Sequence, residues 1–172
     1  MTLISDEYRK LNAQLHFEAP EWGRQSIKYW QTVKELADRV GTKSMLDYGC
    51  GKQMLKAALE PFGYEVLGYD PAFPALSAPP EPARLVICTD VLEHVEPECL
   101  DAVLEDLHRV TLDVTLIVVA TRESSRKMPD GSSPHRIVKD QAWWTDKVGM
   151  RFKKLQTLQK DEKVFGLLVT RK

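Results

Sequence analysis

The chain has 172 residues, of which 43% are hydrophobic and 28% are charged, and its formal net charge is −1. This length is typical of one domain with a sizeable core, and the composition is that of an ordinary globular protein. The balanced charge gives no global attraction for nucleic acid, and no run of about 18 apolar residues exists that could span a membrane.

The N-terminus and the cysteines indicate the cellular compartment. The first ten residues are polar and mixed in charge, without the apolar core of a secretory signal. The three cysteines, Cys50, Cys88 and Cys99, do not have the paired spacing of a metal site. Two of them fall in apolar strand or turn positions, where a free thiol packs as a small apolar residue. We therefore expect a reduced, cytoplasmic protein without a metal centre.

Two helices are predicted before the first strand. Residues 5–17 place Tyr8, Leu11 and Leu15 on one face, and residues 25–40 form a second amphipathic helix that ends at Gly41. The apolar stripe of this second helix consists of Ile27, Trp30, Val33, Leu36 and Ala37. Trp22 and Gly23, in the loop between the two helices, are candidates for a lid contact.

The pattern around which the chain is organised lies at residues 44–53. A short apolar run ends at Asp47, and Gly49 and Gly51 follow at the start of a helical pattern. The glycines let the backbone turn sharply and approach a ligand closely, while the first N–H groups of the helix face the same crevice. A second apolar strand ends about 20 residues later at Asp70, where a nucleotide-binding α/β unit places its acceptor for ribose hydroxyls. The helix at residues 53–62 is expected to bury Leu55, Ala58, Leu59 and Phe62.

A third apolar strand, residues 85–88, leads into a segment with an acid and a histidine. Asp90 and Val91 come at the carboxyl end of this central strand, where open α/β sheets bind their ligands. His94 is suited to proton transfer near neutral pH, but a histidine beside a helix start also serves as a hydrogen-bonding cap, so both roles stay open.

The remaining elements complete an α/β pattern. A helix is predicted over residues 98–110, a strand over 114–120, a polar loop over 121–134 and a helix over 139–148. Strands at 151–158 and 163–171 follow as a hairpin with a charged turn at 159–162. The alternation predicts a mostly parallel sheet with helices on both faces and one reversed strand at the end.

In this order, the motifs resemble those of class I S-adenosylmethionine (SAM)-dependent methyltransferases. Residues 47–51 are similar to that family's first motif, Asp70 to the acid ending its second strand, and residues 90–95 to the segment after its fourth strand. The resemblance implies a Rossmann-like sandwich in which the N-terminal helices pack near the cofactor site. It also implies one domain, 1–172, with N-terminal helices (1–41), a cofactor-binding core (43–120) and an acceptor-side region (121–172).

The resemblance also implies site residues and ligands. SAM is the expected cofactor and S-adenosylhomocysteine its product. The expected cofactor-binding residues are Asp47, Gly49, Cys50, Gly51, Asp70, Pro71, Ala72, Asp90 and Val91. His94 and His135 are the candidates for a general base or an acceptor contact. The basic residues near His135 form either an anion-binding or a solvated loop; they are Arg122, Arg126, Lys127, Arg136 and Lys139. Trp143 and Trp144 point about 100° apart, so one is expected in the core and the other in the pocket wall.

Two features depart from the family's pattern. Gln53 stands where a third glycine is usual, and its side chain is expected to narrow the approach to the cofactor's amino-acid end. Residues 71–82 contain too many prolines for the usual helix and third strand, so we expect a compressed loop with at most a short edge strand at 75–77. The adenine would then rest on Pro71, Ala72 and Leu76.

The function that these features favour is methyl transfer from SAM to a small-molecule or sugar-like acceptor. A SAM-binding protein without catalysis stays open because of Gln53 and the shortened loop. A nicotinamide-dependent oxidoreductase is disfavoured by the missing third glycine, and a nucleic-acid methyltransferase by the absence of an acid-Pro-Pro-aromatic motif at residues 90–93. The short chain also leaves open that a second protomer or a partner protein completes the pocket.

Overall fold

The computed structural model describes residues 2–161 and 163–172, with only the backbone for 159–161. Its helices are α1 (Asp6–Glu18), α2 (Trp30–Val40), α3 (Met54–Leu59), α4 (Leu100–Val110) and α5 (Gln141–Gly149). Its strands are β1 (Ser44–Tyr48), β2 (Glu65–Tyr69), β3 (Ala83–Thr89), β4 (Thr111–Ala120), β5 (Phe152–Asp161) and β6 (Val164–Arg171). None of the helices in these two ranges combines the length and the apolarity needed to cross a membrane.

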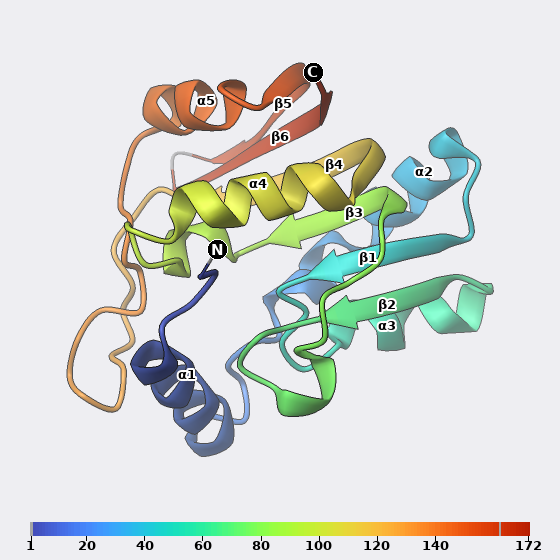
Figure 1. Ribbon diagram of the computed structural model, residues 1–172. Helices are drawn as coiled ribbons and strands as arrows, with labels where there is room; N and C mark the ends of the chain where they lie inside the picture. Colours follow the sequence, from blue (N-terminus) through green and yellow to red (C-terminus); the bar gives the residue numbers. More distant parts are fainter. Residues whose placement is uncertain (1, 162) are drawn as a thin grey trace.

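The strands form one sheet with the order β2-β1-β3-β4-β6-β5 (Figure 1). The pairs β1–β2, β1–β3 and β3–β4 are parallel, whereas β6 runs antiparallel to both β4 and β5. The prediction of a mostly parallel sheet with a reversed strand at the end is confirmed. The turn predicted at residues 159–162 includes Glu162, which lies outside the described residues.

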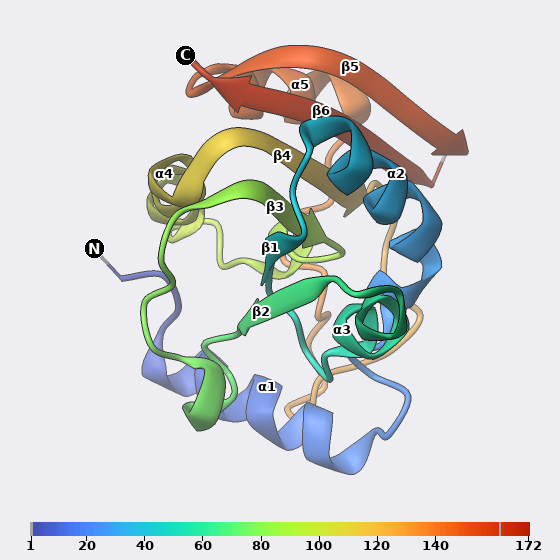
Figure 2. The same ribbon diagram turned by 90° about the vertical axis from the view of Figure 1, so that its right-hand side faces the viewer.

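Two apolar layers cover the two faces of the sheet because successive strand residues point in opposite directions. In β3, Leu85 and Ile87 pack in a cluster with residues of α2 and α3. Val86 and Cys88 pack on the other face with residues of α4 and α5. Figure 2 shows α4 on one side of the sheet and α2 and α3 on the other. Burial on both faces explains why β3 is a continuous apolar run.

Helix α1 lies apart from these layers, beside the carboxyl ends of the parallel strands (Figures 1 and 2). Ser5 caps its first turn by accepting a hydrogen bond from the Tyr8 backbone N–H. Tyr8 and Leu15 form a small apolar cluster with Met128 of the loop after β4. The position of α1 at this end of the sheet allows it to form one wall of a site there.

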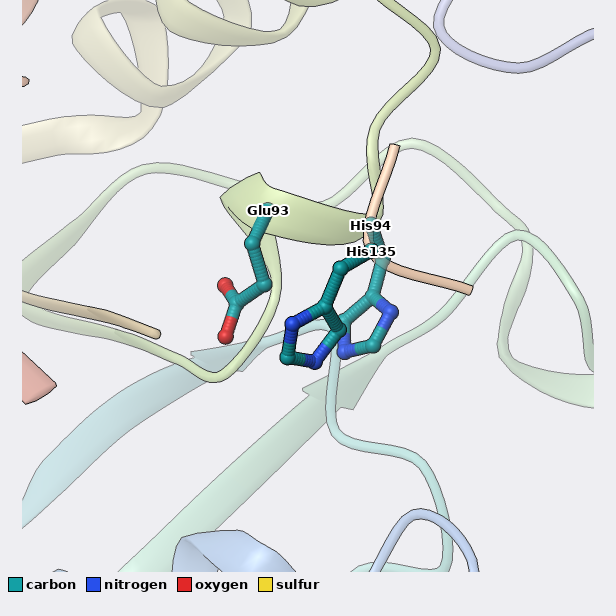
Figure 3. A group of neighbouring side chains, drawn as sticks. All are labelled: Glu93, His94 and His135. Carbon is teal, nitrogen blue, oxygen red and sulfur yellow. The ribbon is translucent and has the colours of Figure 1, made fainter. Parts of the chain in front are cut away.

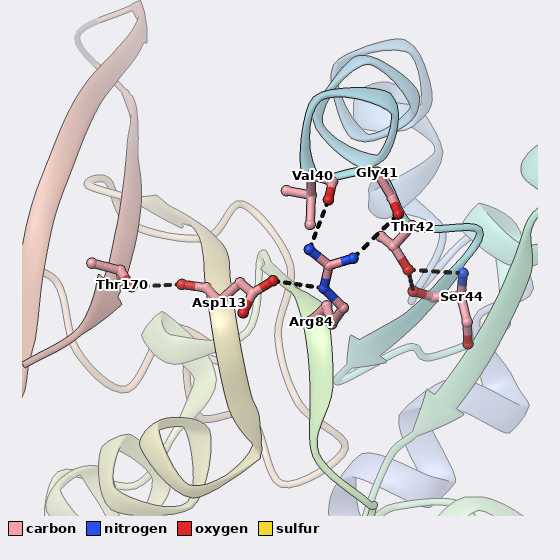
Figure 4. A network of polar contacts seen from close by, with 7 residues as sticks. All are labelled: Val40, Gly41, Thr42, Ser44, Arg84, Asp113 and Thr170. Atoms are coloured by element: carbon pink, nitrogen blue, oxygen red, sulfur yellow. Dashed lines mark hydrogen bonds and ion pairs between the residues drawn. The ribbon is translucent and has the colours of Figure 1, made fainter.

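A polar network fastens the opposite end of the sheet (Figure 4). The Arg84 guanidinium donates to the carbonyls of Val40 (2.9 Å) and Gly41 (3.2 Å) at the end of α2, and it pairs with Asp113 of β4 at 2.7 Å. The Thr170 hydroxyl of β6 donates to the Asp113 carbonyl at 2.6 Å. This network ties α2, β3, β4 and β6 together far from the strand ends that face α1.

Three local predictions are wrong. Residues 25–29 form a 3₁₀ turn, so Ile27 leaves the expected stripe and is exposed. Helix α3 ends at Leu59, and a 3₁₀ turn with Pro61 follows, which leaves Phe62 51% exposed and stacked on Trp30. Residues 74–76 form a 3₁₀ turn in place of the expected edge strand. All three segments contain 3₁₀ turns, which follow neither the period of an α-helix nor that of a strand.

Candidate active site

A cavity of about 540 Å³ lies at the carboxyl ends of β1, β2, β3 and β4. Its walls come from α1, the α1–α2 connection, the strand-end turns and the loop after β4. Open α/β sheets bind their ligands at this edge. The structure brings Gly49, Cys50, Gly51, Asp70, Pro71, Ala72, Asp90, Val91, His94 and His135 of the predicted site to this cavity.

The turn after β1 requires both of its glycines. Gly49 and Gly51 have positive φ angles of 80° and 50°. A Cβ on Gly49 would lie 2.4 Å from the Val91 side chain, and one on Gly51 would lie 2.7 Å from the carbonyl oxygen of Gly23. The backbone N–H groups of Gly49 and Cys50 both donate to the Tyr69 carbonyl at the end of β2. The turn is therefore packed between the end of β2, Val91 and the α1–α2 connection.

Asp70 places a buried carboxylate against this turn. Its Oδ2 accepts from the Gly51 N–H and its Oδ1 from the Ala72 N–H, both at 2.9 Å. Burial raises the pKa of Asp70, and these two hydrogen bonds oppose that rise by favouring the charged form. Each carboxylate oxygen keeps a further lone pair for a ligand hydroxyl.

Two residues of the glycine motif lie behind the cavity wall. Asp47 is only 1% exposed and is not among the cavity residues. Burial, together with the nearby charge of Asp70, raises the pKa of Asp47 to about 7. The Gln53 side-chain oxygen lies beside Gly68, outside the cavity lining, so Gln53 does not narrow the cavity as expected. Leu76, expected under the adenine, is also outside the lining; its carbonyl accepts from the Asp70 N–H.

The turn after β3 carries a strained residue. Asp90 has a φ of 54°, which a non-glycine residue adopts at a cost of the order of 1 kcal/mol or more. Its N–H donates to the Val118 carbonyl at 2.9 Å. Burial raises the pKa of Asp90, while Lys28, His135 and a hydrogen bond from the Tyr29 side chain oppose the rise. The 3₁₀ turn Leu92–His94 follows and brings His94 to the cavity.

His94 and His135 meet edge to face, with ring centroids 4.9 Å apart. His94 Nδ1 donates to the Pro134 carbonyl at 2.8 Å, and His135 Nδ1 donates to the Arg122 carbonyl at 2.6 Å. Because a carbonyl only accepts, Nδ1 of each ring carries a proton, and in the neutral ring Nε2 then presents a lone pair. Burial, and then His135, lowers the pKa of His94 to about 3.

Glu93 links the turn that carries His94 to the loop that carries His135. Its Oε1 accepts from the Ala120 N–H at 2.9 Å, and its backbone carbonyl accepts from the N–H groups of Arg136 (2.7 Å) and Ile137 (3.0 Å). The side chain is fully buried, and burial together with the charge of Asp90 raises the pKa of Glu93 to about 8.

The predicted basic and aromatic residues divide between cavity and surroundings. Arg122 and Arg126 line the cavity, and Arg126 pairs with Glu21. Lys127 and Lys139 do not line it, and Arg136 lies over the Tyr8 ring. The pocket-wall position expected for one of the two tryptophans is wrong, because Trp144 is buried in the core and Trp143 packs edge to face against it.

The α1–α2 connection covers one side of the cavity. Trp22 lines the cavity and packs edge to face on His94 at 5.3 Å. The Lys52 ammonium donates to the carbonyls of Ala19 (2.8 Å) and Pro20 (2.9 Å), and its N–H donates to the Gly23 carbonyl at 3.1 Å. Residues 19–23 are thus docked on the glycine turn.

Sequence reasoning missed the polar face of α1. Tyr8, Asn12 and His16 line the cavity, and burial lowers the pKa of His16 to about 4. The signal was present, since these residues are four apart and share one helical face. This spacing does not indicate a ligand site by itself, because only the tertiary structure places α1 at the strand ends.

Comparisons with known proteins agree with this geometry. The model of a family described as "Methyltransferase domain" matches residues 10–167. Among proteins with curated descriptions, none matches the chain significantly by sequence.

Solved structures share the fold at low sequence identity. 1,6-Didemethyltoxoflavin-N1-methyltransferase from Burkholderia thailandensis, solved with 1,6-didemethyltoxoflavin and S-adenosylhomocysteine, is 14% identical with a TM-score of 0.68, over 96% of this chain and 89% of that one. DhpI in complex with SAH is 14% identical with a TM-score of 0.65, over 95% of each chain. The PH0226 protein from Pyrococcus horikoshii OT3 is 14% identical with a TM-score of 0.62, over 86% of this chain and 92% of that one. The family model matches most of the chain, so the protein belongs to the methyltransferase-domain family.

Proposed function

We propose that this protein transfers a methyl group from SAM to a small-molecule acceptor and releases S-adenosylhomocysteine. Family membership supports methyl transfer, and two of the similar proteins were solved with S-adenosylhomocysteine. The observation that carries the proposal is the Asp70 carboxylate, which is held in the cavity wall by the Gly51 and Ala72 N–H groups. A carboxylate fixed in this way is suited to accept hydrogen bonds from the two hydroxyls of a ribose.

The residues around Asp70 fit the rest of the cofactor. Pro71 and Ala72 offer apolar surface for the adenine, and the glycine turn lets the methionine part approach the backbone. Bound SAM supplies a methyl group already activated on a sulfonium, so the bond to sulfur breaks with its electron pair left on sulfur. The chain's own task is to hold the acceptor in line with that bond.

The acceptor is expected on the side of the cavity where His94, His135 and Trp22 lie. Each imidazole has an Nε2 atom, opposite the carbonyl-bound Nδ1, that can accept a hydrogen bond from the acceptor. Helix α1 and the docked segment 19–23 enclose this side, which favours a small acceptor over a polymer. The small substrate of the similar Burkholderia enzyme supports the same class.

Calorimetric titration with S-adenosylhomocysteine and, separately, with NAD tests the proposal. We expect micromolar binding of S-adenosylhomocysteine, about −8 kcal/mol, and no heat with NAD. Asp70→Ala should weaken this binding at least tenfold, because each charge-assisted hydrogen bond contributes about 1.5–3 kcal/mol. Asp70→Asn keeps the shape of the side chain and isolates the effect of its charge.

Asp113→Ala is the matched control, since Asp113 lies in the network at the opposite end of the sheet (Figure 4). The affinity of this variant for S-adenosylhomocysteine should equal that of the unmodified protein. A folded protein that binds neither ligand contradicts the proposed function, and binding of NAD alone supports an oxidoreductase.

A further inference from the structure

Three potential metal ligands converge beside the cavity: Glu93, His94 and His135 (Figure 3). One donor atom from each residue lies within 4.8 Å of the other two. Glu93 and His94 come from the turn after β3, whereas His135 comes from the loop after β4. The sequence gives no paired cysteine spacing, and this mixed set from two distant segments was not expected.

The two imidazoles are oriented by backbone carbonyls. Pro134 fixes Nδ1 of His94 and Arg122 fixes Nδ1 of His135. Both bonds use Nδ1, so Nε2 is the nitrogen of each ring that these carbonyls leave free to face an ion. Histidines that bind metal ions are commonly held in this manner, because a carbonyl on one ring nitrogen fixes the tautomer and directs the other nitrogen to the ion.

The carboxylate provides an independent observation. Glu93 is 0% exposed, and its Oε1 is used by the Ala120 N–H. Its Oε2 has no hydrogen-bond partner in the part of the chain that the structure describes. A fully buried polar atom without a partner is costly, and such atoms are rare in folded proteins. Figure 3 shows this carboxylate on the same side of the turn as the two imidazole rings.

The surrounding charges favour a cation. The charge of Asp90 acts on both Glu93 and His135, so two carboxylates stand against two imidazoles. Lys28 and Arg122 offset part of this negative charge from outside the triad. An ion at the centre would lie close to the Glu93 carboxylate and would satisfy its free oxygen.

We propose that Glu93, His94 and His135 bind a divalent transition-metal ion of the Zn²⁺, Mn²⁺ or Fe²⁺ type. Two imidazoles and one carboxylate are a donor set that such ions prefer, and three protein ligands leave positions open for other molecules. Zn²⁺ binds these donors at about 2.0–2.2 Å, so the ligand atoms of a tetrahedral site lie about 3.4 Å apart. Because the ligand atoms lie within 4.8 Å of one another without an ion, binding requires a small shift of the loop that carries His135 toward the turn after β3.

The ion would also activate the methyl acceptor. This role, unlike metal binding itself, rests on the proposed function. An acceptor hydroxyl that binds at an open position loses its proton to solvent water, because a divalent ion lowers the pKa of a bound oxygen. The oxyanion then forms a bond to the methyl carbon of SAM while the carbon–sulfur bond breaks, and the electron pair stays on sulfur. The acceptor class is therefore a hydroxylated small molecule, and the two histidines act as ligands.

Metal titration of the full chain without a histidine tag tests this site directly. The protein is stripped with EDTA and dialysed, and then titrated with Zn²⁺ by calorimetry and with Co²⁺ by visible absorption. We expect saturable binding of one equivalent. His135→Ala and Glu93→Gln should each weaken Zn²⁺ binding at least about 100-fold, since even the loss of an outer-shell partner costs 10–100-fold. Glu93→Gln preserves the acceptor for the Ala120 N–H and therefore the local fold.

His108→Ala is the control, because His108 of α4 packs on Phe152 outside the triad, and it should bind Zn²⁺ like the unmodified protein. Absence of saturable binding, or equal binding by all variants, overturns the inference. A parallel titration with S-adenosylhomocysteine separates the two proposals. Binding of S-adenosylhomocysteine without Zn²⁺ leaves the proposed function and removes the metal site, and the reverse result leaves only the metal site.

Discussion

At the scale of single residues, Asp47 shows what burial does to an acid beneath a ligand site. Its pKa is raised to about 7 from an ordinary value of 3.8, first by burial and then by Asp70. The folded chain therefore keeps a proton that the unfolded chain releases above about pH 4. The stability associated with this proton is fully present below pH 4 and is lost as the pH rises through 7.

We expect the free energy of unfolding of the Asp47→Asn variant to equal that of the unmodified protein near pH 4 and to exceed it at pH 8. The difference at pH 8 should be of the order of 4 kcal/mol, at about 1.4 kcal/mol for each unit of pKa. Urea unfolding of both proteins across this range measures this difference, and the buried acids that do not interact with Asp47 titrate in both proteins and cancel. A difference that does not change with pH would contradict the assignment.

The glycine turn gives a second prediction at this scale. Gly51→Ala adds a Cβ that lies 2.7 Å from the Gly23 carbonyl at a φ of 50°, whereas Gly63→Ala meets nothing within 4 Å at a φ of 75°. Both should lose about 1 kcal/mol of stability from the left-handed backbone. Only Gly51→Ala should also weaken S-adenosylhomocysteine binding, because its Cβ displaces the segment docked on the turn. Equal affinities of the two variants in calorimetric titration would show that this contact has no role in the site.

At the scale of elements, the segment 19–23 acts as a cover whose position depends on a few contacts. Lys52 holds the carbonyls of Ala19 and Pro20, and Trp22 packs on His94. Trp22→Ala removes an aromatic contact that is typically worth about 0.5–1.5 kcal/mol. We expect S-adenosylhomocysteine to dissociate several-fold faster from this variant in stopped-flow measurements.

Trp143→Ala is the comparison for the cover, because Trp143 of α5 packs against Trp144 and does not line the cavity. It should lower stability and leave the dissociation rate unchanged. If both variants release the ligand at the same rate as the unmodified protein, Trp22 does not cover the bound ligand.

The elements that the sequence predicted well are those with a regular period. The stripe of α4 and the apolar runs of β3 and β4 repeat at the spacing of a helix or a buried strand, so their existence and type could be read directly. The 3₁₀ turns at 25–29, 60–62 and 74–76 could not, because segments of three to five residues are too short to show a period.

At the scale of the whole molecule, the site joins segments that the sequence reveals unequally. The residues at the strand ends could be predicted, since Gly49, Gly51, Asp70 and Asp90 follow apolar strands and a parallel sheet brings its carboxyl ends together. The α1 residues could not, because only tertiary packing places this helix at the same edge. The convergence of His135 with Glu93 likewise depends on the hydrogen bonds that dock residues 136 and 137 on the Glu93 carbonyl.

The proline-rich segment 71–82 also shapes the whole molecule. It spans the distance from β2 to β3 with a single 3₁₀ turn, so β2 stays at the edge of the sheet. The Asp70 N–H donates to the Leu76 carbonyl and closes the loop directly behind the carboxylate. The compressed loop expected from the sequence thus leaves Asp70 in place even though the usual third strand does not form.

A crystal structure of the complex with S-adenosylhomocysteine tests the central claim most directly. In that complex we expect both ribose hydroxyls to donate to the Asp70 carboxylate, the adenine to lie on Pro71 and Ala72, and the sulfur to face His94 and His135. The proposed site would be contradicted by a ligand that binds outside the cavity. It would also be contradicted by a ligand in the cavity whose ribose lies away from Asp70 and whose sulfur lies away from the histidines.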